Sequence, residues 1–302
     1  MIRFVLLTYL AASAACAAQS IDIDTAAQVY QAAAMREQVR ASLGAMPEHT
    51  RQLFATGSSA KLSDAQLAAV SAAAVRGFRI DVFEAPALQA LAESLDLPAL
   101  TKIEAFLTGD LGRRMVSADV AVAELGEANI DKVMSGEITV PTTPKRDALF
   151  EKLERSTRSA ESSVQIFLNM GQAVAVGTAI GSGMDPAAVG ERARKSGDAS
   201  RAELEKNMRL PMRRFMAYGY RELSDSDLKH LLAFLDSAPG KRYVAAYNAA
   251  MRAGFDAMGR RTGEQLGEAL REMAQADMAP PPEIVPPPRI AAPPPAGPTP
   301  SP

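Results

Sequence analysis

The sequence predicts an all-α fold, built as a multi-helix bundle. Between Asp24 and Met278 the chain is rich in Ala, Leu, Met, Glu and Arg, which have high helix propensity. Apolar residues recur at intervals of three and four, as in Leu228, Leu231 and Leu235, and this spacing places them on one face of a helix. No segment shows the alternation of apolar and polar residues that is typical of a half-buried strand.

The first residues have the order of a secretory signal peptide, which we assign to residues 1–18. A positive charge at Arg3 is followed by an apolar run over 4–15 that is too short to span a bilayer, and then by small residues. Cleavage is expected after Ala17 or after Ala18. The sequence therefore predicts a periplasmic or secreted protein.

Cys16 leaves open a second interpretation of this leader, in which the protein is a lipoprotein acylated at that cysteine. Such sites usually have an aliphatic residue three positions earlier, and Ser13 stands there. We therefore favour simple cleavage. The mature chain then contains no cysteine, and we expect neither a disulfide nor a thiolate metal site.

Helix starts are marked by two capping-box patterns. Ser63 is followed three residues later by Gln66, and Ser224 is followed in the same way by Asp227. A later helix, expected over about 199–220, contains a proline that should kink it.

Proline-rich stretches divide the chain. The segment "ITVPTTPKR" at 138–146 has two prolines and β-branched residues, so we place there the joint between an N-terminal helical half, 19–140, and a C-terminal half, 141–278. Residues 279–302 are expected to form a disordered, extended proline-rich arm. A spacer or a ligand for a groove is one interpretation, and we favour an unstructured tail without a recognition role.

The stretch 164–184 contains no charged residue over 21 positions. Gly177 and Gly181 form a pair of small residues that would allow a membrane helix to pack closely against another. Its polar residues and glycines lower the hydropathy and the helix propensity. We therefore expect a central helix that is buried on all sides and packed through Gly and Ala, and no integral membrane protein.

A short pattern occurs twice in the chain. "AFLTGDLGRR" at 105–114 aligns without a gap on "AFLDSAPGKR" at 233–242. Each copy has an apolar helix that ends in Phe-Leu, a short break, and a glycine with two basic residues that begins a second helix. The shared structural positions are Phe106 and Gly112 in the first copy and Phe234 and Gly240 in the second. We therefore predict two related helical halves.

The second copy belongs to a longer segment, "LSDSDLKHLLAFLDSAPGKRYVAAY" at 223–247. This segment resembles the signature of a bacterial secreted family catalogued as domain of unknown function 2059, over about 210–265 with a hairpin at 223–258. The residues that carry the resemblance are Asp227, Leu228, Phe234, Ser237 and Gly240. The chain departs from the family by having Asp227 in place of Glu and Leu235 in place of Tyr.

The resemblance implies an exported α-helical protein, and it assigns no activity because the family has none. We interpret its motif residues as architecture. Leu228 and Phe234 are expected in the core, Ser237 as a helix cap, and Gly240 as a point of close helix contact.

Catalytic and metal-binding patterns are weak. His49 has no second ligand at metal-binding spacing. Ser226, Asp227 and His230 share one helix face, yet a nucleophile, a base and an orienting group normally come from separate elements. We predict no catalytic, cofactor-binding or metal-binding residue.

One basic group lies beside apolar residues in the second half, and it comprises Arg209, Arg213 and Arg214 next to Met208, Met212, Phe215 and Met216. Contact with an anionic lipid or wall polymer is one interpretation. We favour an amphipathic helix with Met and Phe facing inward and Arg facing outward.

The net charge of −2 does not indicate a nucleic-acid partner. The sequence therefore predicts an exported, non-catalytic helical protein that acts by binding an envelope protein or a lipid. A helical carrier of an apolar ligand, and a hydrolase whose site is not recognisable, are the two alternatives. A pocket lined by Met, Leu and Phe would favour the carrier.

Overall fold

The computed structural model describes residues 21–57 and 62–278, and over these ranges the fold is all-α, as predicted, without a β-strand. The expected signal peptide and proline-rich arm lie outside the described residues. The helices are α1 (Ile23–Ala32), α2 (Met35–Leu43), α3 (Met46–Gly57), α4 (Asp64–Gly77), α5 (Ile80–Ser94), α6 (Leu97–Leu107), α7 (Asp110–Ala123), α8 (Glu127–Ser135), α9 (Pro144–Thr157), α10 (Ser159–Ser182), α11 (Pro186–Gly219), α12 (Asp225–Asp236) and α13 (Ala238–Met278).

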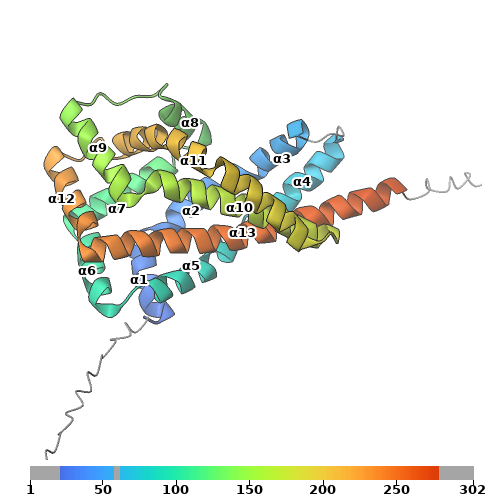
Figure 1. The fold of residues 1–302 in the computed structure, drawn as a ribbon, viewed down its shortest axis with the longest axis horizontal. Coiled ribbons are helices and arrows are strands. Elements are labelled where there is room, and N and C mark those ends of the chain that lie inside the picture. Colours follow the sequence, from blue (N-terminus) through green and yellow to red (C-terminus); the bar gives the residue numbers. More distant parts are fainter. Residues whose placement is uncertain (1–20, 58–61, 279–302) are drawn as a thin grey trace, which may run out of the picture.

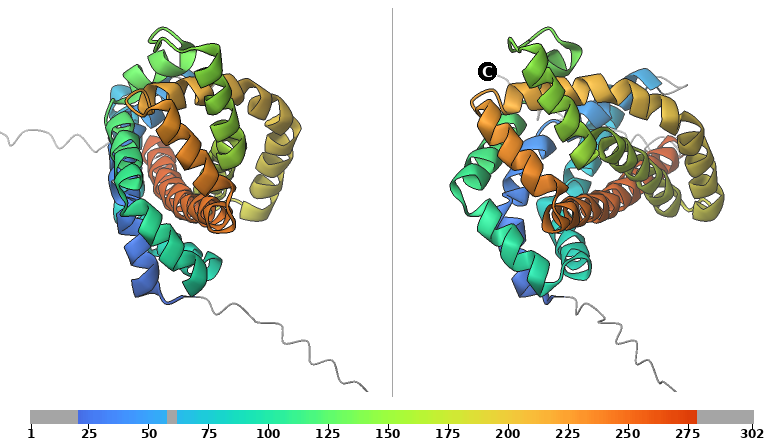
Figure 2. Two further views of the ribbon diagram at one scale, coloured as in Figure 1. Left: turned by 90° about the vertical axis from the view of Figure 1, so that its left-hand side faces the viewer. Right: turned by 60° about the vertical axis from the view of Figure 1, so that its left-hand side comes forward.

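The long helix α13 organises the bundle. It runs along the molecule with α10 beside it, while α6 and α12 lie near its start and α3 and α4 near its far end (Figure 1). Seen nearly along its axis, α13 lies between N-terminal helices on one side and α10 and α11 on the other (Figure 2, left). One hydrophobic core joins both parts of the chain, since Phe83 of α5 packs edge-on against Phe255 of α13 at a ring-centroid distance of 5.2 Å.

Helices α10 and α13 contact each other through their backbones. A Cβ atom added to Gly177 would lie 2.1 Å from the carbonyl oxygen of Arg260, and one added to Gly263 would lie 2.1 Å from that of Val174. Only glycine allows so close an approach. The expected close packing of α10 through small residues is therefore present where it contacts α13.

Other parts of the α10 surface are not buried, so the expectation of burial on all sides is wrong. Phe167 is 63% exposed and Ile180 is 43% exposed. The reason is that α13 and α11 cover only part of the helix surface. By length and composition alone, α10 is also the helix in the described part of the chain that is apolar enough to cross a membrane.

The predicted helix starts are present. Ser63 with Gln66, and Ser224 with Asp227, form capping boxes in which each pair exchanges side-chain and backbone hydrogen bonds. The expected joint at 138–146 includes the non-helical segment before α9, and α9 begins at Pro144. Helix α11 begins at Pro186, earlier than expected, and it continues through Pro211.

The two similar segments form two helical hairpins, α6–α7 and α12–α13, which pack against each other. Phe106 and Phe234 stack with a centroid separation of 3.7 Å and an interplanar angle of 4°. A Cβ on Gly112 would lie 2.0 Å from the carbonyl oxygen of Phe106, and one on Gly240 would lie 1.9 Å from that of Phe234. The matching residues of the two hairpins therefore have matching surroundings.

Ion pairs link the hairpins reciprocally. Arg114 at the start of α7 pairs with Asp227 in the first turn of α12 at 2.8 Å. Arg242 occupies the matching position in α13, and it pairs with Asp96, the residue that caps α6. An arginine of α7 thus binds at the start of α12, and an arginine of α13 binds at the start of α6.

Candidate functional site

A cavity of about 470 Å³ lies in the bundle, lined by residues of α2 and of each helix from α7 to α13. We call it the apolar cavity because methionine, leucine and aromatic side chains form much of its wall. These include Met115, Met212, Met216, Met251, Phe215 and Phe255. Methionine side chains are flexible and polarisable, so such a wall adapts to apolar ligands of different shape.

Helix α11 supplies one wall of the cavity. Met212, Phe215 and Met216 line it, as expected for the inward face of an amphipathic helix. The expectation that all three arginines face outward is wrong, because Arg213 and Arg214 are half-buried. The guanidinium of Arg214 donates hydrogen bonds to carbonyl oxygens at the end of α8, including that of Ser135 at 2.7 Å. It lies directly beside Gly136, the residue that ends this helix.

The polar part of the cavity wall includes a carboxyl group and two tyrosines that form hydrogen bonds there. The Tyr220 hydroxyl donates to Oδ1 of Asp119 at 2.9 Å, and the Tyr247 hydroxyl donates to Oε1 of Gln38 at 2.9 Å. Asp119 is half-buried and faces the cavity. Among the described lining residues, Asp119 is the only acidic side chain, and there is no Lys, Arg or His.

Burial raises the pKa of Asp119 from its ordinary value of 3.8 to about 7, and the hydrogen bond from Tyr220 opposes this rise. Burial also raises the pKa values of Tyr220 and Tyr243 well above 10. These hydroxyls are therefore neutral donors at physiological pH. At mildly acidic pH the whole cavity wall is uncharged.

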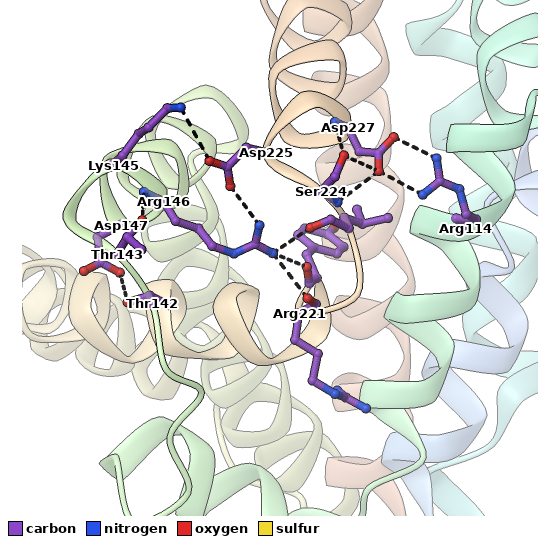
Figure 3. Close-up of polar contacts among 12 residues, drawn as sticks. Arg114, Thr142, Thr143, Lys145, Arg146, Asp147, Arg221, Ser224, Asp225 and Asp227 are labelled. Atoms are coloured by element: carbon purple, nitrogen blue, oxygen red, sulfur yellow. Dashed lines mark hydrogen bonds and ion pairs between the residues drawn. The ribbon is translucent and has the colours of Figure 1, made fainter.

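Arg146 of α9 fixes the turn that carries Tyr220. Its guanidinium donates to the carbonyl oxygens of Tyr220 at 2.9 Å and Leu223 at 2.7 Å, and to Oδ1 of Asp225 at 3.0 Å. Figure 3 shows this side chain extending from α9 into the turn between α11 and α12. Because Tyr220 in turn holds Asp119, α9 contributes indirectly to the position of the cavity carboxyl group.

A second pocket, of about 690 Å³, adjoins the apolar cavity, and we call it the basic pocket. Ser162, Val244 and Asn248 line both spaces. The basic side chains that line it are Arg155, Arg158, Arg201, Lys241 and Arg252, and the acidic ones are Glu161, Glu205 and Asp236. It opens between α9, α10, α11 and α13.

The motif residues lie beside the cavity rather than in it. Leu228 is fully buried and Phe234 is half-buried against the core. The Ser237 hydroxyl accepts a hydrogen bond from the Gly240 backbone N–H at 3.2 Å, where α13 begins. Leu235, which departs from the family pattern, lines the cavity.

The residues of the weak catalytic and metal-binding patterns do not come together as a site in the described part of the chain. His230 and Ser226 are exposed, while Asp227 bonds to Ser224 and Arg114. The Arg114 guanidinium holds the pKa of Asp227 well below its usual range. Nδ1 of His49 lies 3.3 Å from a carboxylate oxygen of Glu127, and over the described ranges no three His, Cys, Asp or Glu residues cluster as metal ligands would.

Sequence reasoning missed Asp119 and its tyrosine partners. A signal was present, since Asp119 is the single acidic residue among the apolar residues of "VSADVAVA" at 116–123. A carboxyl group within such a stretch has to lie on a solvated face or meet a buried donor. Whether Asp119 is solvated or meets a buried donor depends on Tyr220 at the end of α11, about a hundred residues further along the chain.

Comparison with known proteins gives no relative: no protein-family description, no curated protein and no solved structure matches this chain.

Proposed function

We propose that this chain is an exported, non-catalytic protein that binds an apolar ligand in the apolar cavity. The observation that carries the proposal is a space of about 470 Å³ walled by methionine and aromatic side chains. This volume lies within the range of small-molecule pockets, and a few polar groups beside an apolar wall are typical of them. Of the functions weighed on the sequence, a carrier explains this feature best.

The test is binding of a neutral apolar probe, N-phenyl-1-naphthylamine, to the purified, delipidated chain. We expect saturable binding of one probe per chain. Ala123→Phe, which places a ring in the cavity wall, should weaken binding at least tenfold. Ala121→Phe, on the exposed face of the same helix, is the matched control and should bind as the unaltered chain does. Equal binding by Ala123→Phe, or no saturable binding by the unaltered chain, would refute the proposal.

The raised pKa of Asp119 is the observation that favours a hydrolase, the third function considered. A carboxyl group with a pKa near 7 suits general acid–base catalysis. However, hydrolysis in the usual arrangements requires an activated nucleophile or a second carboxylate. Serine hydroxyls line the cavity, but among the described lining residues there is neither a histidine to activate one nor a second acid beside Asp119. Asp119→Asn should therefore leave probe binding intact, whereas turnover of a fatty ester abolished by this change would favour the hydrolase.

We also propose that the two hairpins are copies of one unit, of the type found in the exported family that the second copy resembles. The stacked Phe106 and Phe234 and the reciprocal arginine pairs support this idea. Export itself is tested by the mass of the chain recovered from the periplasm or medium. A mass without residues 1–17 or 1–18 supports cleavage, and a lipid-modified Cys16 would contradict it.

A further inference from the structure

We propose that the ligand is an anionic amphiphile, with its alkyl chain in the apolar cavity and its acidic headgroup in the basic pocket. This inference rests on the proposed function and specifies its ligand class. The two spaces differ sharply in chemistry, since one is walled by apolar side chains and the other is lined by five basic and three acidic ones. A molecule that fills both must itself be apolar at one end and charged at the other.

The two spaces share one boundary. Ser162, Val244 and Asn248 line both of them, so the two spaces are neighbours, and the proposal places the ligand across these side chains. Two of the three are polar, and the neighbouring Ser159 and Ser163 of α10 also line the cavity. Hydroxyl and amide groups at the boundary suit the polar linkage between an alkyl chain and a headgroup.

The charges in the basic pocket favour an anion. Arg158, Lys241 and Arg252 are exposed, and none of them forms an ion pair with another residue in the described part of the chain. Of the three acids, Glu161 pairs with Arg209 at 2.9 Å and Asp236 accepts a hydrogen bond from Ser156, while Glu205 forms no ion pair in the described part of the chain. The five basic side chains outnumber these acids. Three basic groups therefore remain to contact a carboxylate or phosphate.

The apolar cavity itself would not hold an acidic headgroup. No basic residue lines it within the described ranges, and Asp119 would repel an anion once ionised. A cationic headgroup placed in the basic pocket would face the like charges of Arg158, Lys241 and Arg252. The basic pocket therefore suits the anionic headgroup, and the apolar cavity suits the alkyl chain.

The experiment measures dissociation constants at pH 6 for four single-chain ligands of equal length, below their micelle-forming concentrations. They are dodecanoate, lauroyl lysophosphatidate, dodecanol and dodecylammonium. The delipidated full chain is compared with the triple variant Arg158→Gln, Lys241→Gln, Arg252→Gln. The control is Lys102→Gln, Arg192→Gln, Arg271→Gln, which removes three exposed basic groups that do not line either space. Circular dichroism verifies that all three proteins are folded.

We expect at least one of the two anionic ligands to bind at least tenfold tighter than dodecanol. The pocket variant should lose this advantage while binding dodecanol unchanged, and the control should keep it. A preference for dodecanoate identifies a free fatty acid, and a preference for the lysophosphatidate identifies a membrane phospholipid. Equal binding of dodecanol and both anions, tighter binding of dodecylammonium, or an equal loss in the control variant would overturn the inference.

These outcomes separate the inference from the function on which it rests. If dodecanol binds as well as the anions, the cavity binds apolar chains and only the headgroup assignment fails. If none of the four ligands binds, the proposed function fails together with the inference.

Discussion

Asp119 provides the sharpest test of the site, because replacing it by asparagine removes a titratable group without removing the hydrogen-bond acceptor. Burial raises the pKa of Asp119 from 3.8 to about 7. The unfolded chain releases this proton near pH 4, while the native chain keeps it until about pH 7. The native state therefore binds more protons between these values, and the free energy of unfolding falls as the pH rises through this window.

The size of the effect follows from the pKa difference. A rise of about three pKa units corresponds to about 4 kcal/mol, which is an upper limit because the carboxyl group borders the cavity. We expect Asp119→Asn to match the unaltered chain in stability near pH 4 and to exceed it by about 2–4 kcal/mol at pH 8. Tyr220 can still donate to the amide oxygen of the variant.

The assay is urea unfolding, followed by circular dichroism, at several pH values from 4 to 8. The measured quantity is the difference in unfolding free energy between the variant and the unaltered chain, which cancels the titration of all other groups. Asp131→Asn removes an exposed carboxyl group of α8 and serves as the control. A difference that stays constant from pH 4 to pH 8 would show that Asp119 is ionised in the native cavity, and the reasoning would be wrong.

Three further predictions concern the frame around the site, and urea unfolding checks each of them. Arg146→Met should destabilise the fold by about 2–4 kcal/mol, since it leaves two turn carbonyls and a carboxylate without their donor; a loss below 0.5 kcal/mol would contradict this role. Phe106→Ala and Phe234→Ala should show a coupling of about 0.5–1.5 kcal/mol in a double-mutant cycle, and strict additivity would contradict their stacking. Gly177→Ala should cost about 3 kcal/mol through its clash with α13, whereas Gly171→Ala, with open space around it in the same helix, should stabilise by about 0.5–1 kcal/mol.

The candidate site could not be predicted from the sequence because its interacting residues lie far apart along the chain. Ser226, Asp227 and His230 are neighbours on one helix, yet Asp227 accepts hydrogen bonds from Arg114 of the other hairpin. Asp119 stands alone among apolar residues in the sequence, but its place in the site depends on Tyr220, which donates to it from a distant part of the chain. Neither pairing follows from helix periodicity.

The amino-acid sequence by itself determined that this protein is helical, where its capping boxes start helices, and which positions of α10 are small enough for close packing. These properties are local, since they depend on backbone preferences and on residues within one or two turns. Only the tertiary structure decided that the methionines of α11 face an open cavity, that a basic pocket adjoins it, and that part of the α10 surface is exposed. Such features depend on the angles at which distant helices cross, and many sequences with the same apolar periodicity would pack those helices differently.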